Sequence, residues 1–222
     1  MNYEIVNLGI VVLSGFTQKA SGRTGMGELY CELRRRYATT PKRYIIHRAW
    51  DADMDELAHL LDRDRTRDFR LAVTAYSWGC GRGVRRLAKS LGQRGIAIDL
   101  LLLIDPVIYR PGFWFSPRQL WALTRLGKFK VPPNVDEVYS WRQVNKGPFG
   151  RRLKLENRRT TVLGGSVMGS HEKLLKYGHS GQGQRDCITD PNIGHDGMDD
   201  DPRIRQMVLD RLDSFVKDRL AG

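Results

Sequence analysis

Short apolar runs alternate with longer amphipathic segments along most of the chain. This alternation is typical of βαβ units, in which helices pack on the faces of a mostly parallel sheet. The apolar runs predict strands at residues 5–13, 43–47, 69–75, 97–104, 135–144 and 160–163. Several of these runs are apolar at successive positions, as parallel strands buried on both faces usually are.

The segments between and after these runs have the spacing of amphipathic helices, and they predict helices at residues 26–37, 53–61, 83–91, 117–126 and 202–220. The last helix is the best defined, because Asp201 can cap its first turn and Pro202 suits the first helical position. Its apolar stripe consists of Ile204, Val208, Leu212, Phe215 and Val216. The expected fold class is therefore α/β, with a mostly parallel central sheet flanked by helices.

The chain has 222 residues, 41% of them hydrophobic, which is enough for one sizeable core and predicts a single domain over residues 1–222. No apolar run approaches the roughly 20 residues of a membrane helix, and residues 1–16 lack the features of a signal peptide. The three cysteines have no metal-ligand spacing and suggest neither a disulfide framework nor a zinc site. We therefore expect a cytoplasmic protein without a membrane span.

The formal net charge of +12 indicates that anionic partners are favoured. The basic residues are spread along the whole chain, with only short clusters such as residues 34–36 and 151–152. This distribution favours a generally basic, solvated surface over a dedicated nucleic-acid-binding face. Acidic lipids, phosphorylated carriers and acidic proteins stay open as partners.

The most informative segment covers residues 69–88, where an apolar run leads into Ala75-Tyr-Ser77-Trp-Gly79 and then into a helical pattern. This order matches a nucleophile elbow, a strained strand-to-helix turn that needs small residues two positions before and after its serine. Ser77 is the candidate nucleophile, and the amide of Trp78 at the start of the helix could stabilise an oxyanion. The structural alternative is that Ser77 only forms a turn or caps the helix.

A serine hydroxyl needs a neighbouring base, and the base needs a third group that orients it. After a nucleophile elbow the acid comes next along the chain, followed by a histidine on a loop before the final helix. His195 meets this requirement. His171 and His179 lie in the Gly-rich residues 164–183 and compete for the role, whereas His47 and His59 precede the serine and are expected to be structural.

The acid is harder to assign. Asp105 directly follows the buried run of residues 97–104, at the carboxyl end of a predicted strand, where functional groups collect in parallel sheets. No acid follows the next strand until Glu156, which lies in a strongly basic segment. We therefore assign the acid to Asp105; the alternative is that its carboxylate only caps the turn with Pro106.

The motifs around Ser77, Asp105 and His195 together resemble the α/β-hydrolase superfamily, and most of all its thioesterase branch. Thioesterase domains of peptide and polyketide synthetases similarly carry the acid one strand after the nucleophile. The resemblance implies an α/β-hydrolase fold and hydrolysis of an acyl ester or thioester through an acyl-serine intermediate, without metal or organic cofactor. The substrate would be a small molecule, with anionic and carrier-bound forms both open.

The resemblance also implies a second oxyanion-hole amide near Phe16, in the loop after the first strand, where Ser14 replaces the histidine that many members carry. We place Gly15 and Tyr76 in the substrate pocket together with Phe113 and Trp114, which belong to an aromatic run. Residues 109–130, which contain this run, occupy the position of a lid; the alternative is that the aromatic side chains pack a helix onto the body.

Further features leave room for other functions. The Gly-rich residues 21–27 could cradle an anion but are better explained as a rim of the active site. The acidic residues 199–201 are better explained by capping of the last helix than by metal binding. The main rival function is a catalytically silent hydrolase-fold protein that binds an anionic partner through its basic surface, and a third is nucleic-acid binding.

Overall fold

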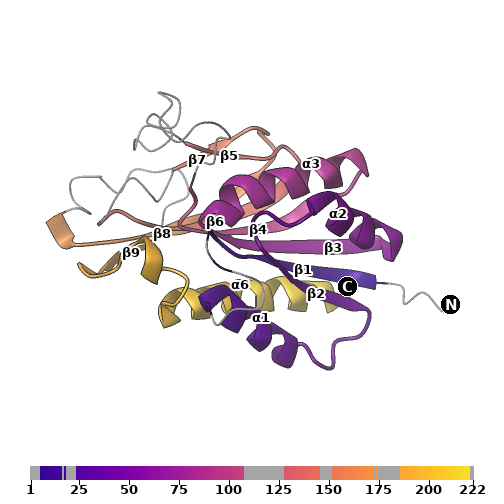
Figure 1. The fold of residues 1–222 in the computed structure, drawn as a ribbon, viewed down its shortest axis with the longest axis horizontal. Helices are drawn as coiled ribbons and strands as arrows, with labels where there is room; N and C mark the ends of the chain where they lie inside the picture. Colours follow the sequence, from indigo (N-terminus) through magenta and orange to yellow (C-terminus); the bar gives the residue numbers. More distant parts are fainter. Residues whose placement is uncertain are drawn as a thin grey trace.

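The computed structural model describes residues 6–16, 18, 24–107, 128–145, 152–172, 174 and 186–220. Their main strands are β1 (Val6–Leu13), β2 (Arg43–Arg48), β3 (Arg65–Tyr76), β4 (Ile98–Ile104), β6 (Val135–Gln143), β8 (Thr161–Gly169) and β9 (Asp186–Thr189). They form one sheet in the order β2-β1-β3-β4-β6-β8-β9, and every neighbouring pair in it is parallel (Figure 1). Two short strands, β5 (Phe129–Val131) and β7 (Leu153–Leu155), form a separate parallel pair.

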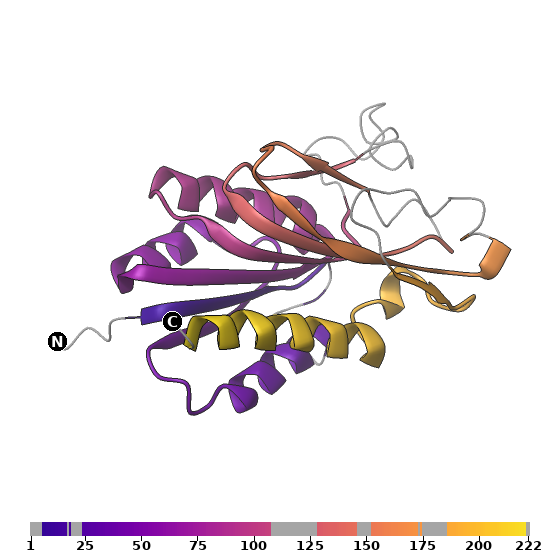
Figure 2. The same ribbon diagram turned by 180° about the vertical axis from the view of Figure 1, so that it is seen from behind.

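Helices cover both faces of this sheet. The longer ones are α1 (Gly25–Arg36), α2 (Met54–Arg63), α3 (Arg85–Gln93) and α6 (Pro202–Leu220). Helices α2 and α3 lie on one face, and α1 and α6 on the other (Figures 1 and 2). Among the described residues, no helix is both long and apolar enough to span a bilayer. The α/β class with a mostly parallel, helix-flanked sheet is therefore confirmed.

The predicted strands correspond to observed ones, with two large differences in length. Strand β3 begins four residues before the predicted start, at Arg65, because its polar first residues extend the pairing toward Val6 through an irregular register. Strand β8 continues to Gly169 instead of ending at residue 163. Its glycines are poor strand formers, but a side chain at Gly165 would lie 2.7 Å from the Ser140 backbone oxygen, so the close strand packing requires glycine there.

The predicted last helix is confirmed over Pro202–Leu220. Its apolar stripe packs into the core of that face, with Ile204, Val208, Leu212 and Val216 almost fully buried. The side chain of Asp201 accepts a hydrogen bond from the Arg203 amide and so caps the first turn, as expected. The predicted helix at residues 117–126 lies outside the described residues.

The strand order reverses between β1 and β3. From β1 the chain moves outward to β2, and it then returns to place β3 on the other side of β1. Such a switch point opens a crevice at the carboxyl ends of the two strands, where parallel α/β sheets bind ligands. The residues that directly follow these strands are Ser14, after β1, and Ser77, after β3.

Candidate active site

Ser77 occupies a strained turn between β3 and a helix. Its backbone φ of 55° lies in the left-handed region, which costs free energy for a residue with a side chain. The turn is held on both sides, because the Ser77 amide donates to the Ile104 oxygen while its own oxygen accepts from the Cys80 and Val107 amides. This is the backbone that the nucleophile-elbow motif predicts.

Gly79 explains why the motif needs a small residue two positions after the serine. A Cβ atom at Gly79 would lie 2.7 Å from the backbone oxygens of both Leu13 and Ser14, at the end of β1. The glycine therefore lets the turn approach the neighbouring strand. The helix begins here with a π-helical turn, Gly79–Val84. The predicted start, residue 83, was four residues later, because glycines are weak helix formers.

His195 lies in a short 3₁₀ turn, His195–Gly197, just before α6. Its Nε2 is 2.7 Å from the Ser77 Oγ, and its Nδ1 is 2.6 Å from the Asp105 Oδ2. The arrangement fits a neutral imidazole that donates from Nδ1 to the carboxylate and accepts the serine proton at Nε2. The structure thus brings the three predicted residues together in one hydrogen-bonded chain.

Asp105 follows β4 and is fully buried. Burial raises the pKa of its carboxyl group, and hydrogen bonds from His195 and Gln143 oppose this increase. The backbone amide of Gln143 donates a hydrogen bond to Oδ1 at 3.0 Å, so Oδ2 accepts the hydrogen bond from the histidine. The backbone φ of Asp105 is 43°, a second strained position in the site. A carboxylate held in this way can orient an imidazole and stabilise its protonated form.

Tyr76 was predicted to line the substrate pocket, and it also makes contacts with His195 that the sequence did not predict. Its ring stacks on the His195 imidazole with centroids 5.1 Å apart, and its hydroxyl donates to the His195 backbone oxygen at 2.6 Å. The tyrosine is only 4% exposed. It therefore supports the histidine from within the core. Its place next to Ser77 in the motif could have indicated proximity to the site, but not this role.

The loop after β1 lies against the nucleophile. A side chain on Gly15 would come within 2.9 Å of the Ser77 Cβ, so only glycine fits beside the serine. Phe16 extends outward, 43% exposed, and its ring lies 4.4 Å from the ring of Trp78. The two residues predicted to supply oxyanion amides, Phe16 and Trp78, are thus neighbours in space.

Gln18 and Asp199 form a link that the sequence did not predict. The Gln18 side chain accepts from the Gly15 amide at 3.1 Å and donates to the Asp199 Oδ2 at 2.6 Å. Asp199 is buried, which raises its pKa to about 6, with the Gln18 hydrogen bond opposing and nearby Asp200 adding to the shift. Its carboxylate therefore connects the loop after β1 to the histidine loop instead of capping α6.

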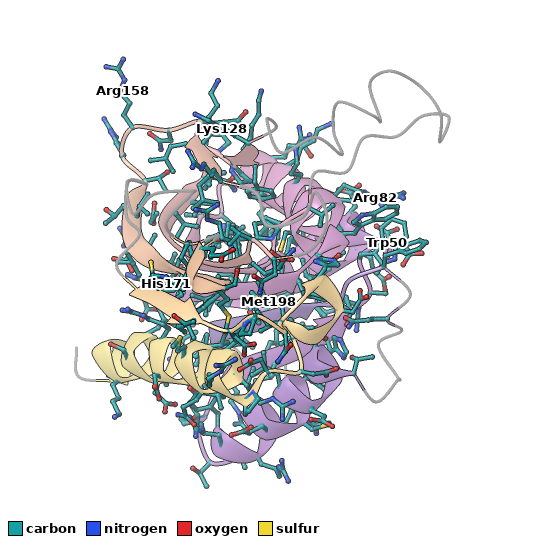
Figure 3. All side chains as sticks on the ribbon, turned by 90° about the vertical axis from the view of Figure 1, so that its left-hand side faces the viewer. Trp50, Arg82, Lys128, Arg158, His171 and Met198 are labelled. Carbon is teal, nitrogen blue, oxygen red and sulfur yellow. The ribbon has the colours of Figure 1, made fainter. Side chains whose placement is uncertain are left out.

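The competing candidates lie elsewhere. His171 is exposed in a helical segment after β8, on the other side of the view in Figure 3 from Trp50 and Arg82. Glu156 pairs with Lys130 at 3.5 Å and is well exposed. His47 is buried and bonded to Ser14 at 2.5 Å, which fits a structural role, and His59 is exposed on α2.

Several of the predicted site residues cannot be compared with the structure. His179, Phe113 and Trp114 lie outside the described residues, as does all of the expected lid except residues 128–130, where β5 begins. Among the residues described, no group of three or more acidic, histidine or cysteine side chains is arranged to hold a metal ion.

No protein-family model matches the chain, and no curated protein matches it.

Proposed function

We propose that this protein is a serine hydrolase that cleaves an ester or thioester through an acyl-serine intermediate. The observation that carries the proposal is the continuous hydrogen-bonded chain from the Ser77 hydroxyl through the His195 imidazole to the buried Asp105 carboxylate. Serine, histidine and acid in this geometry are the parts that acyl transfer needs. The strained backbone of Ser77 adds support, because strain of this kind gathers at functional sites.

In the proposed reaction, the Ser77 Oγ attacks the substrate carbonyl carbon while its proton moves to the His195 Nε2. Asp105 stabilises the resulting imidazolium through Nδ1. His195 then gives the proton to the departing alcohol or thiol as the carbon–oxygen or carbon–sulfur bond breaks. A water molecule, deprotonated by the same Nε2, attacks the acyl-serine, and the proton returns to Ser77 as the carboxylic acid leaves.

The amides of Trp78 and Phe16 are the proposed oxyanion hole. Trp78 begins the helix that follows the nucleophile, so its amide belongs to the positive end of the helix dipole. Phe16 follows Gly15, whose lack of a side chain lets this loop approach Ser77. Removal of one oxyanion-hole donor costs about 2.7–4 kcal/mol of transition-state stabilisation in a serine protease. Gly15 and Tyr76 form the inner edge of the proposed pocket.

We further infer that the fold is of the α/β-hydrolase type, close to its thioesterase branch. The nucleophile turn follows a central strand, the acid follows the next strand along the chain, and the histidine precedes the last helix. This chain order of serine, acid and histidine is typical of that fold. The adjacent pairing of β3 and β4 agrees with an acid one strand after the nucleophile.

Labelling with a fluorophosphonate probe tests the proposal, because only an activated serine reacts quickly with it. We expect the wild-type protein to be modified at Ser77, the Ser77→Ala variant to be unmodified, and a Ser214→Ala variant, which changes an exposed serine on α6, to behave as wild type. Mass spectrometry of the labelled peptide identifies the serine. A series of acyl chains offered as oxygen esters and as thioesters then defines the substrate.

A folded wild-type protein that resists the probe and cleaves none of these esters would sink the proposal. The chain would then be better described by the rival function, a silent protein of this fold that binds an anionic partner.

A further inference from the structure

The outer side of α3 carries a row of basic residues that the proposed hydrolysis does not use. Arg85, Arg86 and Lys89 lie in α3, and Arg82 lies in the π-helical turn before it. All four line the same groove, so they lie on one side of this helical segment. The opposite face is apolar and buried, and it consists of Val84, Leu87, Ala88 and Leu91. The basic face therefore points away from the core.

This row is unfavourable for the helix itself. Like charges three and four residues apart destabilise a helix by about 0.2–0.5 kcal/mol per pair. The first turns of the helix contain no acidic residue, and cations near a helix N-terminus also oppose its dipole. A bound anion would offset these costs.

The basic face borders a groove of about 800 Å³ between α3 and the β5–β7 pair. Its lining includes three basic residues of α3 and Arg82 of the turn before it, together with Lys130 of β5 and Glu156. Among the described residues that line it, five cations thus face one carboxylate, and that carboxylate already contacts Lys130. The volume falls within the range of about 300–1,000 Å³ that is typical of small-molecule sites.

The far wall of the groove is fixed in place. Asn134 in the turn after β5 donates hydrogen bonds to the Ala88 and Ile96 backbone oxygens, at 2.9 and 3.1 Å. Phe129 and Val131 of β5 are buried in the same core as α3. Pro132 and Pro133 line the groove between these anchors and give it an apolar side. The groove is therefore formed by well-packed elements.

Two of the groove cations, Arg85 and Lys89, differ from arginines elsewhere on the surface. Many of those are paired with a carboxylate: Arg36 with Asp213, Arg63 with Asp64, Arg65 with Asp62, Arg70 with Asp99, and Arg205 with Glu28. Within the part of the chain that the structure describes, neither Arg85 nor Lys89 forms an ion pair, and both are exposed. Their charge is available to a ligand.

One end of the groove lies close to the candidate active site. The Arg82 guanidinium lies over the Trp50 ring at 4.9 Å, and the Trp50 ring contacts that of Trp78, the residue after the nucleophile (Figure 3). Arg85 and Lys89 follow in α3, about 6 Å apart along the helix axis at a rise of about 1.5 Å per residue. The cations are therefore distributed along an extended path that starts beside the aromatic rings.

We propose that this groove binds an organic molecule that carries two or more phosphate groups. Guanidinium groups bind phosphate oxygens with paired hydrogen bonds, and several cations in a row match several phosphates. Pro132 and Pro133 give the groove an apolar side that suits the organic part of such a molecule. Binding at this site does not depend on the proposed hydrolysis.

Isothermal titration of adenosine diphosphate into the Ser77→Ala protein tests the site, because this variant keeps hydrolysis out of the measurement. The groove variant adds Arg85→Gln and Lys89→Gln. The matched control adds Arg35→Gln and Lys217→Gln, which remove the same charge from exposed positions on α1 and α6, on the other face of the sheet. Adenosine and a duplex oligonucleotide are titrated in parallel.

We expect one adenosine diphosphate per chain, a Kd at least tenfold higher in the groove variant and a Kd within twofold of the parent in the control. Adenosine should bind at least tenfold more weakly, because it lacks phosphate. Absence of binding, equal binding of adenosine, or equal loss in both variants would overturn the proposal. Preference for the duplex, with a steep salt dependence, would replace it with a nucleic-acid surface.

Discussion

Tyr76 holds His195 twice, by stacking its ring on the imidazole and by donating its hydroxyl hydrogen to the backbone oxygen of the same residue. The tyrosine ends β3 directly before Ser77, so one strand end positions both the candidate nucleophile and its base. The position of the histidine therefore depends on the sheet as well as on its own loop.

Tyr76→Phe separates these two contacts, because it keeps the ring and removes only the hydroxyl. A hydrogen bond of this kind is worth about 0.5–1.5 kcal/mol, so we expect ester hydrolysis to fall by about two- to tenfold. Tyr76→Leu removes the stacking as well and should be more damaging. The measurement is kcat on one activated ester, with circular dichroism as the folding control. Equal activity in all three proteins would argue against the positioning role.

Asp105→Asn should lower kcat by orders of magnitude, since an asparagine cannot stabilise the imidazolium and favours the wrong tautomer of His195. The corresponding change in serine proteases costs ~10⁴ in kcat. Glu156→Gln should change kcat by less than about tenfold, because Glu156 is exposed and forms a surface ion pair with Lys130. Both variants are assayed on the same ester. An active Asp105→Asn enzyme beside an inactive Glu156→Gln enzyme would contradict the assignment.

His195→Ala should be as damaging as Ser77→Ala, because the members of a triad act as a unit and their effects are far from additive. His171→Ala should be mild, since His171 lies exposed after β8. Single-turnover assays of the three variants provide the comparison. Retained activity in His195→Ala would require another base.

Gly79→Ala should destabilise the fold, because the new Cβ would collide with the Leu13 and Ser14 backbone oxygens. Overpacking of this kind costs about 1–3 kcal/mol. Gly92→Ala is the matched control: it lies in α3, a Cβ there would meet only ordinary contacts at 3.5 Å, and alanine should stabilise the helix by about 0.5–1 kcal/mol. Urea unfolding of the two variants should therefore give changes of opposite sign.

The raised pKa of Asp199 makes the stability of the folded protein depend on pH. Its pKa is about 6 in the folded protein and 3.8 in the unfolded chain, so the folded protein binds more protons between these values. The contribution of Asp199 to stability is then greatest below about pH 4 and falls as the pH rises to about 6. The full loss is about 3 kcal/mol, an order-of-magnitude figure.

Asp199→Asn removes this titration and keeps an acceptor for Gln18. We expect the difference in unfolding free energy between Asp199→Asn and wild type to increase in favour of the variant from pH 4 to pH 6, and to level off above. Urea unfolding at pH 4, 5, 6 and 7 measures it, and other titrating groups cancel in the difference. A constant difference across this range would mean that the pKa of Asp199 is not raised.

Most of the sheet could be predicted because its strands are apolar at almost every position, as in β1 and β4. The first residues of β3 and the last residues of β8 could not be predicted. The polar residues and glycines there have low strand propensity, and they are extended because they pair with neighbouring strands. The short strands β5, β7 and β9 carry too few residues for a pattern.

For the site, the motif around Ser77, the strand end at Asp105 and the loop position of His195 together predicted that these residues meet. The bond from Gln18 to Asp199 was not predictable, because its partners are 181 residues apart and neither lies in a motif that implies the other. The stacking of Tyr76 on His195 likewise depends on how a strand end meets a distant loop.

The sequence separations within the triad also bear on how the site assembles. Ser77 and Asp105 follow adjacent strands, but His195 is 118 residues from the serine and 90 from the acid. Contacts between residues so far apart form late, after the intervening chain has been ordered. During synthesis, the serine therefore leaves the ribosome long before its base. In the proposed mechanism the hydroxyl stays unreactive until the last segment has docked, so reactivity toward a serine probe would report the completion of folding.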